Sequence, residues 1–408
     1  MPAADLDLAQ NSAALNFGGA PTGPLAGVRI VDLSTVVMGP FATQLLGDLG
    51  ADVIRIEPPY DNARYSPGDI GRTSGMAPLF LNVNRNKRSI ALNLKSDDDR
   101  ATLEELLETA DVFVTNMRLQ ALTRLGLDYE QIHERFPTLI YAHAQGFHSA
   151  SSRGARPAYD EVIQAVSGLV NLQERAHGTL QYLPTFVGDK VASLYLAIGV
   201  VAALYHRRAT GTGQRIELPM ADALISWTAV EHLAGTTYRP ATAPAGNPLS
   251  LIGEHAAMRT KDGAIAAVAY TYHDIKRLLI GAGCDDLAAD PRWDSTEIDT
   301  ATFVAGLRAV FEHSATKTTA EWEAYLQAND IPYGVVVDIA ELPDDPYVQE
   351  RGLIVEAEHP TEGRIRMIAN PLRFSETPVD IRRHAERPGQ STDEVLAGLR
   401  RAAAAHSN

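Results

Sequence analysis

Short apolar runs alternate with amphipathic stretches along the first half of the chain. Runs of strand length, rich in Val and Ile, stand at 28–34, 52–57, 88–94, 111–116 and 138–147. Between them, apolar residues at helical spacing predict helices over 39–50, 96–110 and 119–126. Such alternation is typical of parallel strands joined by helical crossovers, and it predicts a doubly wound, Rossmann-like α/β domain.

Two more helices are predicted, over 158–173 and 190–208, before the amino-acid composition changes. The stretch 236–253 is rich in Pro, Gly, Ala and Thr and is predicted to be a long loop. Later strands are expected near VVVDIAEL and RIRMIANPLRF. The predicted organisation is a loosely ordered leader over 1–25, a large domain over 26–225, a small α+β domain over 226–335 and a part over 336–408 that returns to the large domain.

The charge balance narrows the range of partners. The formal net charge of -15 argues against a general nucleic-acid binder, which needs a basic face. The longest apolar stretch, 191–204, is shorter than the about 20 residues of a membrane span, so a core helix and no membrane contact are expected. Cys284 is the sole cysteine, which fits a reducing cytoplasm.

The motifs of common ligands are missing from the sequence. The first predicted strand is followed by STVVMGPF rather than a G-x-G-x-x-G loop, and Glu57 at the end of the second strand does not replace it. His143, His148 and His206 have no metal-binding spacing. Neither a G-x-S-x-G elbow nor a P-loop occurs. We therefore expect neither a metal nor a permanently bound cofactor.

The segment NVNRNKRSIALNLK (82–95) crowds asparagines and four cations together. One interpretation is a solvated turn before a strand. The other is a clamp for an anionic ligand, in which guanidinium and amide groups donate to phosphate and Arg88 belongs to the binding set.

The segment GDKVAS (188–193) places Asp189 just before a long apolar helix. An aspartate at this position can cap the helix. It can also act as a nucleophile, and the two roles are compatible because the helix start holds the carboxylate ionised.

Six strings occur in order and at plausible spacing: GVRIVDLSTVVMGPFATQLLGDLGADVIRIEPP, NKRSIALNLK, ADVFVTNMRLQALTRLGLDY, YDEVIQAVSGL, VGDKVAS and TGTGQRIELPMADAL. Together they resemble the class III CoA-transferases, the CaiB/BaiF family that includes formyl-CoA transferase and carnitine CoA-transferase. The resemblance runs from about residue 25 to 380. Each string alone is a weak signal, and the six together are a specific one.

The resemblance implies that Asp189 attacks an acyl-CoA thioester, giving an aspartyl mixed anhydride and then an aspartyl-CoA thioester. Asp160 matches an acidic position beside this nucleophile, where it is either catalytic or a first-turn helix acid. Acyl-CoA and an acceptor carboxylic acid are the implied substrates. The positions that match CoA-contacting residues of the family are Val36, Val37, Met38, Asn116, Met117 and Arg124.

At three positions this chain differs from related sequences in ways that bear on the reaction. Val37 and Pro58 stand where oxalate-using members carry glutamine and arginine, so a less polar acyl group is expected. Tyr159 stands where the related α-methylacyl-CoA racemases carry a catalytic histidine. A tyrosine, with a pKa of about 10, exchanges protons poorly at neutral pH. Racemisation and acyl-CoA binding without chemistry remain the alternatives to transfer.

The resemblance also implies an interlocked homodimer, in which each chain threads through the other. The loop over 240–253 is expected to cover the CoA site. The sequence leaves the donor acyl group and the acceptor acid undetermined.

Overall fold

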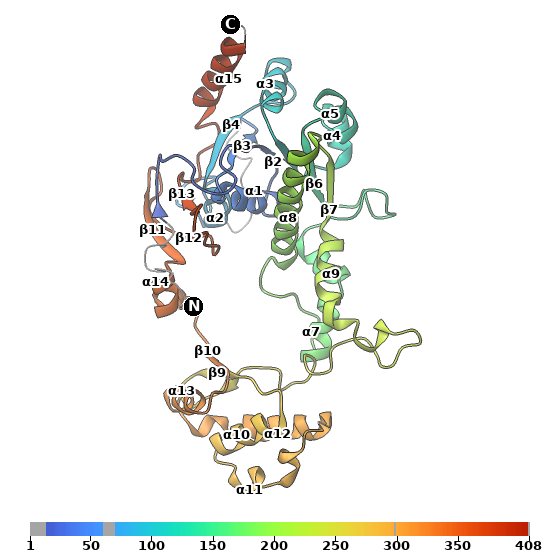
Figure 1. The fold of residues 1–408 in the computed structure, drawn as a ribbon, viewed down its shortest axis with the longest axis vertical. Coiled ribbons are helices and arrows are strands. Elements are labelled where there is room, and N and C mark those ends of the chain that lie inside the picture. The colour runs from blue at the N-terminus through green and yellow to red at the C-terminus, as the bar shows by residue number, and fades with distance from the viewer. Residues whose placement is uncertain (1–13, 60–69, 298, 407–408) are drawn as a thin grey trace. The chain divides into compact units, whose positions relative to one another are not determined.

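The computed structural model describes residues 14–59, 70–297 and 299–406 and separates them into two units (Figure 1). The first unit takes the described residues within Met1–Val170, Tyr182–Ala229 and Pro346–Asn408. The second takes Asn171–Gln181 and Val230–Asp345. The second unit thus ends ten residues beyond the small domain expected over 226–335 and also includes the separate stretch Asn171–Gln181.

A six-stranded parallel sheet forms the centre of the first unit, with the order β4-β3-β2-β5-β6-β7. Its strands are β2 (Arg29–Leu33), β3 (Asp52–Glu57), β4 (Lys87–Ala91), β5 (Val112–Thr115), β6 (Ile140–Gln145) and β7 (Arg215–Pro219). The four middle strands of this order are almost wholly buried, as strands covered on both faces must be. The α/β prediction is confirmed.

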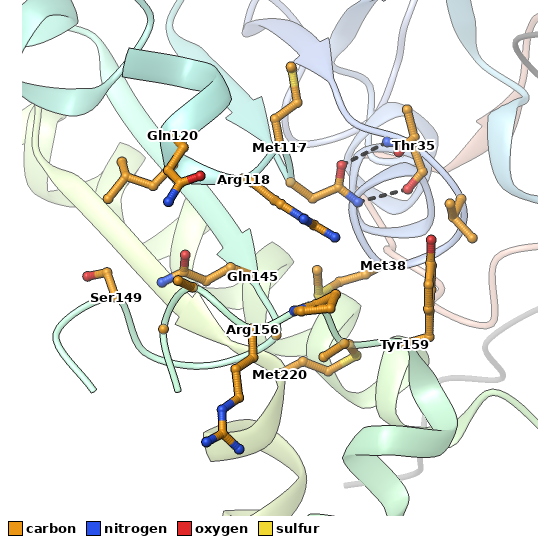
Figure 2. Close-up of a pocket in the computed structure, with 18 of the residues that line it drawn as sticks. Thr35, Met38, Met117, Arg118, Gln120, Gln145, Ser149, Arg156, Tyr159 and Met220 are labelled. Carbon is orange, nitrogen blue, oxygen red and sulfur yellow. Dashed lines mark hydrogen bonds between the residues drawn. The ribbon is translucent and has the colours of Figure 1, made fainter. Parts of the chain in front are cut away.

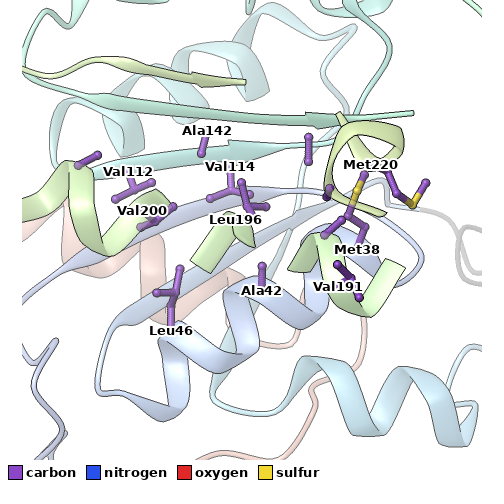
Figure 3. Packing of buried hydrophobic residues seen from close by; sticks show 14 of the residues in the cluster. Met38, Ala42, Leu46, Val112, Val114, Ala142, Val191, Leu196, Val200 and Met220 are labelled. Carbon is purple, nitrogen blue, oxygen red and sulfur yellow. The ribbon is translucent and has the colours of Figure 1, made fainter. Parts of the chain in front are cut away.

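Helices cover both faces of this sheet. One face packs against α1 (Met38–Asp48), α8 (Val187–Thr210) and α9 (Met220–His232), with side chains such as Leu46, Val114 and Leu196 interlocked (Figure 3). The other face packs against α3 (Asp97–Glu108), α4 (Leu119–Leu125), α5 (Tyr129–Arg135) and α15 (Thr392–His406). The remaining elements of this unit are β1 (Ala14–Leu15), α2 (Pro78–Asn84), α6 (Asp160–Val166), α14 (Pro346–Arg351), β11 (Ile354–His359), β12 (Gly363–Ile368) and β13 (Asp380–Ile381).

The strand order reverses between β2 and β5. In open parallel sheets the chain leaves in opposite directions at such a point, and the loops after the two strands open a crevice at their carboxyl ends. The chain continues from β2 into the loop before α1, and from β5 into the loop before α4. The two loops that the sequence associated with CoA therefore flank the position where this fold places its ligands.

α8 is long and apolar enough to cross a membrane by length and composition, and only part of it is buried within the structure. Its inner side, including Val191, Leu196 and Val200, belongs to the core beneath the sheet. A core helix passes the same test of length and composition, and the packing of this inner side agrees with the core helix expected from the sequence.

The second unit has its own core. A three-stranded antiparallel sheet has the order β10-β9-β8, and tryptophans 293 and 322 are buried beside it. Its elements are β8 (Met258–Arg259), β9 (Ala264–Ala267), α10 (Tyr272–Gly281), α11 (Asp285–Ala288), α12 (Thr300–His313), α13 (Thr319–Ala328) and β10 (Tyr333–Val335). α7 (Leu169–His177) and α9 begin in the first unit and end in the second.

Three local predictions were wrong. The strand expected near VVVDIAEL is absent, because β10 ends at Val335, the first residue of that string, and no strand is formed over 336–342. The single helix expected over 158–173 is two helices, α6 and α7, because Gly168 has a φ of 88°, in the left-handed region that ends an α-helix. In the expected loose leader, Ala14–Leu15 pairs with β13 as a parallel strand, and the Asn16 N–H donates to the Ile381 carbonyl. This part of the leader is therefore integrated into the first unit.

Candidate active site

A pocket of about 480 Å³ opens at the carboxyl ends of β2, β5 and β6 (Figure 2). This volume lies within the range of small-molecule sites, about 300–1,000 Å³. Gln120, Gln145 and Ser149 lie at one side of the pocket, and Thr35, Met38 and Tyr159 lie at the other. Its lining includes Thr35, Val36, Met38, Asn116, Met117, Arg118, Gln120, Gln145, Ser149, Arg156, Tyr159, Asp189 and Met220.

Asp189 is the one carboxylate among the residues lining this pocket. It lies in the first turn of α8 and is partly buried. Burial raises the pKa of its carboxyl group to about 7, and the charge of Asp160 adds to the rise, while hydrogen bonding from the Met38 backbone N–H opposes it. A raised pKa in a cleft is typical of a group that takes part in chemistry.

Asp160 lies behind Asp189 and does not line the pocket. Its Oδ1 accepts the backbone N–H groups of Gly188 at 2.7 Å and Asp189 at 3.1 Å. Its Oδ2 accepts the Gln164 Nε2–H at 2.6 Å. A side chain from the start of α6 thus supplies the acceptor that the start of α8 lacks, because no side chain caps α8 from its own N-cap position. The contacts of Asp160 are therefore with the start of α8 and with Gln164.

The loop between β2 and α1 is held in a strained conformation beside Asp189. Val36 has a φ of 68°, which is rare for a β-branched residue. The Asn116 carboxamide accepts the Thr35 backbone N–H at 2.9 Å and donates to the Thr35 carbonyl at 2.8 Å. The Ser193 hydroxyl lies 2.7 Å from the carbonyl oxygens of both Met38 and Asp189. These contacts fix the loop against the first turn of α8.

Two guanidinium groups in the pocket are free to bind an anion. Arg118 follows β5, and Arg156 lies in the loop before α6. Among the described residues, neither side chain has a hydrogen bond or an ion pair, although Arg118 extends into the pocket (Figure 2). Unpaired arginines in a cleft suit phosphate or carboxylate, which the guanidinium fork binds through two parallel hydrogen bonds.

The structure brings most of the predicted site residues together. Val36, Met38, Asn116, Met117 and Asp189 all line the pocket. Asn116 does so with its carboxamide already engaged on the neighbouring loop, as described above.

Three predicted contact residues lie elsewhere. Val37 is buried behind the loop as the N-cap residue of α1. Arg124 is exposed on α4 and donates from Nε to the Gln120 carbonyl at 3.1 Å. Arg88 pairs with Asp52 at 2.7 Å and with Glu394 at 3.3 Å.

The segment 82–95 is neither a solvated turn nor an open anion clamp. Arg85 pairs with Asp48 at 2.6 Å, and Lys87 pairs with Asp32 at 3.1 Å, with all four side chains buried. Burial lowers the pKa of Lys87 to about 8, and the charge of Asp32 opposes this shift. Arg85, just before β4, therefore ties this segment to α1, and Lys87 ties β4 to β2, while Lys95 is exposed.

Several residues that line the polar side of the pocket were not predicted from the sequence, among them Arg118, Gln145 and Arg156. A signal was available for two of them. Gln145 lies near the end of the strand predicted over 138–147, and Arg118 follows the strand predicted over 111–116. Polar residues at the carboxyl ends of parallel strands meet at one edge of the sheet. Arg156 had no such signal, because its loop has no regular pattern.

The arrangement provides one reactive group and a way to hold an anionic ligand beside it. A carboxylate with a pKa near 7 is ionised in about half of the molecules at neutral pH. The Met38 backbone N–H, at the start of α1, hydrogen-bonds with the Asp189 carboxyl group, and a donor of this kind can stabilise an oxygen that gains charge. The site therefore suits nucleophilic attack by Asp189 on a carbonyl carbon.

Comparison with known proteins gives a consistent result. The sequence model of CoA-transferase family III matches residues 25–392. The acetyl-CoA:oxalate CoA-transferase of Acetobacter aceti is 33% identical over 399 residues, which cover 94% of this chain and 97% of the relative. The human succinyl-CoA:glutarate CoA-transferase is 30% identical over 379 residues, which cover 91% and 85%. A solved CaiB/BaiF family protein from Brucella suis is 26% identical with a TM-score of 0.80, covering 93% of this chain and 100% of the neighbour.

Proposed function

The chain belongs to CoA-transferase family III, and from this premise we propose that it moves CoA from an acyl-CoA thioester to an acceptor carboxylic acid through covalent intermediates on Asp189. The observation that carries the proposal is the position of Asp189: a partly buried carboxylate with a pKa of about 7, in a pocket that also holds two unpaired arginines.

The proposed reaction conserves thioester energy. The Asp189 carboxylate attacks the acyl carbon, the C–S bond breaks, and the CoA thiolate leaves a mixed anhydride behind. The thiolate then attacks the Asp189 carbonyl, which releases the donor acid and leaves an aspartyl-CoA thioester. The acceptor carboxylate attacks the carbonyl of this thioester, its C–S bond breaks, and the CoA thiolate leaves as a second mixed anhydride forms between Asp189 and the acceptor. The thiolate then attacks the acceptor acyl carbon of this anhydride. The new acyl-CoA leaves, and Asp189 regains its carboxylate.

The chain's own residues would support each step. Arg118 and Arg156 would bind the phosphates of CoA, since they are the unpaired cations of the pocket. The Met38 N–H would stabilise the oxygen that gains charge when the thioester is attacked. Asp160 would hold the start of α8, so that the carboxylate remains aimed at the thioester.

We also propose an acyl group less polar than oxalate. Several side chains that line the pocket with Asp189 are apolar: Val36, Met38, Tyr159 and Met220. Methionine adapts its shape to different apolar groups, and an exposed tyrosine ring offers a flat contact surface. A second carboxylate placed among these apolar side chains would lose its hydration, and the two arginines of the pocket are already assigned to the phosphates of CoA.

Trapping the intermediate tests the proposed mechanism. The protein is incubated with a panel of acyl-CoA donors and pooled carboxylic acids, and hydroxylamine is added during turnover. We expect new acyl-CoA species by mass spectrometry and an aspartyl hydroxamate at residue 189, because hydroxylamine cleaves anhydrides and thioesters. Turnover with no label at 189, or deuterium exchange at the α-carbon of a 2-methylacyl-CoA without an acceptor, would contradict the proposal.

We further propose that two copies form the homodimer implied by the resemblance, interlocked through their chains. The outer side of α8 supports this, because it exposes a continuous apolar stripe. The stripe follows helical spacing through Leu194, Ile198, Val201 and Tyr205, with Ile198 64% exposed. A stripe of this kind on a core helix is typical of a surface that a second chain covers.

Replacing Ile198 by glutamate is expected to shift the dimer to a monomer, because it places a charge in the middle of the covered stripe. Analytical ultracentrifugation measures the mass in solution. The control is Leu287→Glu on α11, which puts the same charge on an apolar residue of similar exposure outside the stripe. An unchanged mass for Ile198→Glu would count against this surface.

A further inference from the structure

Glu217 on β7 accepts hydrogen bonds from two residues that line the polar side of the pocket. Its Oε1 accepts the Gln145 Nε2–H at 2.5 Å and the Ser149 backbone N–H at 2.7 Å. Its Oε2 accepts an N–H of Arg215 at 2.9 Å. Burial acts to raise the pKa of Glu217, but the hydrogen bonds from Ser149 and the charge of Arg215 hold it below its ordinary value. Glu217 is thus an ionised carboxylate, and all its contacts are with donors.

The charge of Glu217 decides which way the Gln145 carboxamide points. An ionised carboxylate has no proton to donate, so it must face the NH2 group of the amide and not its oxygen. The Gln145 oxygen is therefore directed away from Glu217, and among the described residues it accepts no hydrogen bond. Gln145 lines the pocket, on the same side as Gln120 and Ser149 (Figure 2).

Gln145 adds an acceptor of fixed orientation to this part of the pocket. Arg118 and Arg156 carry only donors, so they select anionic parts of a ligand. The Gln145 oxygen complements them, because it selects a part of the ligand that carries an N–H. Leaving this oxygen without a donor in the bound state would cost binding free energy.

We propose that Gln145 is a specificity-determining residue that accepts a hydrogen bond from an N–H group of the bound ligand, and that Glu217 is the positioning residue that locks its amide in this orientation. This inference rests on the proposed function, which makes acyl-CoA the ligand. CoA offers two sources of such an N–H: the amides of the pantetheine arm and the amino group of adenine.

Substitutions separate the two roles. Gln145→Leu removes the acceptor and keeps a side chain of similar size. Glu217→Gln replaces the carboxylate by an amide that both donates and accepts, so the Gln145 amide can flip and present its NH2 group to the pocket. Glu130→Gln is the matched control, because it removes the other acidic neighbour of Arg215, 4.0 Å away, and Glu130 does not line the pocket.

Calorimetric titration with CoA, with pantetheine and with adenosine 3′,5′-bisphosphate tests the inference. We expect Gln145→Leu and Glu217→Gln to raise the Kd for CoA by about three- to tenfold, as for the loss of one hydrogen bond, and Glu130→Gln to leave it unchanged. The two variants should lose affinity for one fragment only, either pantetheine or the nucleotide. The fragment that is affected carries the N–H group that Gln145 binds. A general loosening of the pocket would weaken both fragments alike.

Unchanged CoA binding by Gln145→Leu, or equal losses with the two fragments, overturns the inference while leaving the proposed function intact. If Glu217→Gln does not fold, Gln145→Leu alone still decides the role of the acceptor. Failure of the wild-type protein to bind CoA would overturn the proposed function, and this inference with it.

Discussion

Replacing Asp189 by asparagine is expected to lower the rate of CoA transfer by at least about 10³-fold, with CoA binding retained. The amide has nearly the same shape as the carboxylate but cannot form an anhydride or a thioester. Arg118 and Arg156 remain in place to hold the anionic ligand. The measurements are the transfer rate by mass spectrometry and the Kd for CoA by calorimetry.

The control for this substitution is Asp222→Asn, an exposed acid in the first turn of α9, beside Met220 of the same pocket. It is expected to retain transfer. Full turnover by Asp189→Asn would rule out covalent catalysis at this position.

Folding of the Asp189→Asn variant can be checked by its stability against pH. In the folded wild type the pKa of Asp189 is about 7, above its ordinary value of 3.8, so the folded state binds this proton more tightly than the unfolded state. The contribution of Asp189 to the free energy of unfolding of the wild type is therefore complete at low pH. It is lost as the pH rises to about 7. Asparagine does not titrate, so the variant should be the more stable above pH 7, by at most about 4 kcal/mol.

Substitutions of Asp160 should separate positioning from charge. Asp160→Ala leaves the N–H groups of Gly188 and Asp189 without their acceptor, at a cost of about 1–3 kcal/mol in unfolding free energy. Because the start of α8 then loosens, transfer is expected to fall by about 10- to 100-fold. Thermal denaturation and kcat measure the two effects.

Asp160→Asn keeps an oxygen for these N–H groups but removes the negative charge that raises the pKa of Asp189. The ionised nucleophile should then persist to lower pH, so the acid limb of the kcat/KM profile moves below that of the wild type. Glu161→Gln is the matched control, since Glu161 raises the same pKa by a smaller effect. An acid limb that does not move would contradict the assigned role of Asp160.

The α/β class and the position of the reactive aspartate could be predicted from the sequence for identifiable reasons. Strands buried on both faces, such as β5 and β6, need continuous apolar runs, and these are visible without a structure. Asp189 stands out because it lies in the first turn of a long apolar helix, and its string is one of six that match one family in order.

The charged segment over 82–95 shows where such reasoning failed. Its crowded cations indicated a clamp or a solvated turn, but Arg85 and Lys87 find Asp48 and Asp32 inside the fold. These partners lie 37 and 55 residues earlier in the chain. No local sequence pattern indicates which distant carboxylate will pair with a buried cation. The role of these cations therefore depends on contacts that form only on folding.

From its own sequence, the chain determines its elements, its family and the chemical group available for catalysis, because periodicity and local motifs are properties of neighbouring residues. The tertiary structure decides what that group can do. Asp160, 29 residues away, holds the start of α8 and raises the pKa of Asp189, while Glu217 sets the orientation of Gln145 across two strands. Charge interactions, desolvation and hydrogen-bond direction depend on distance and burial, which only the folded chain defines.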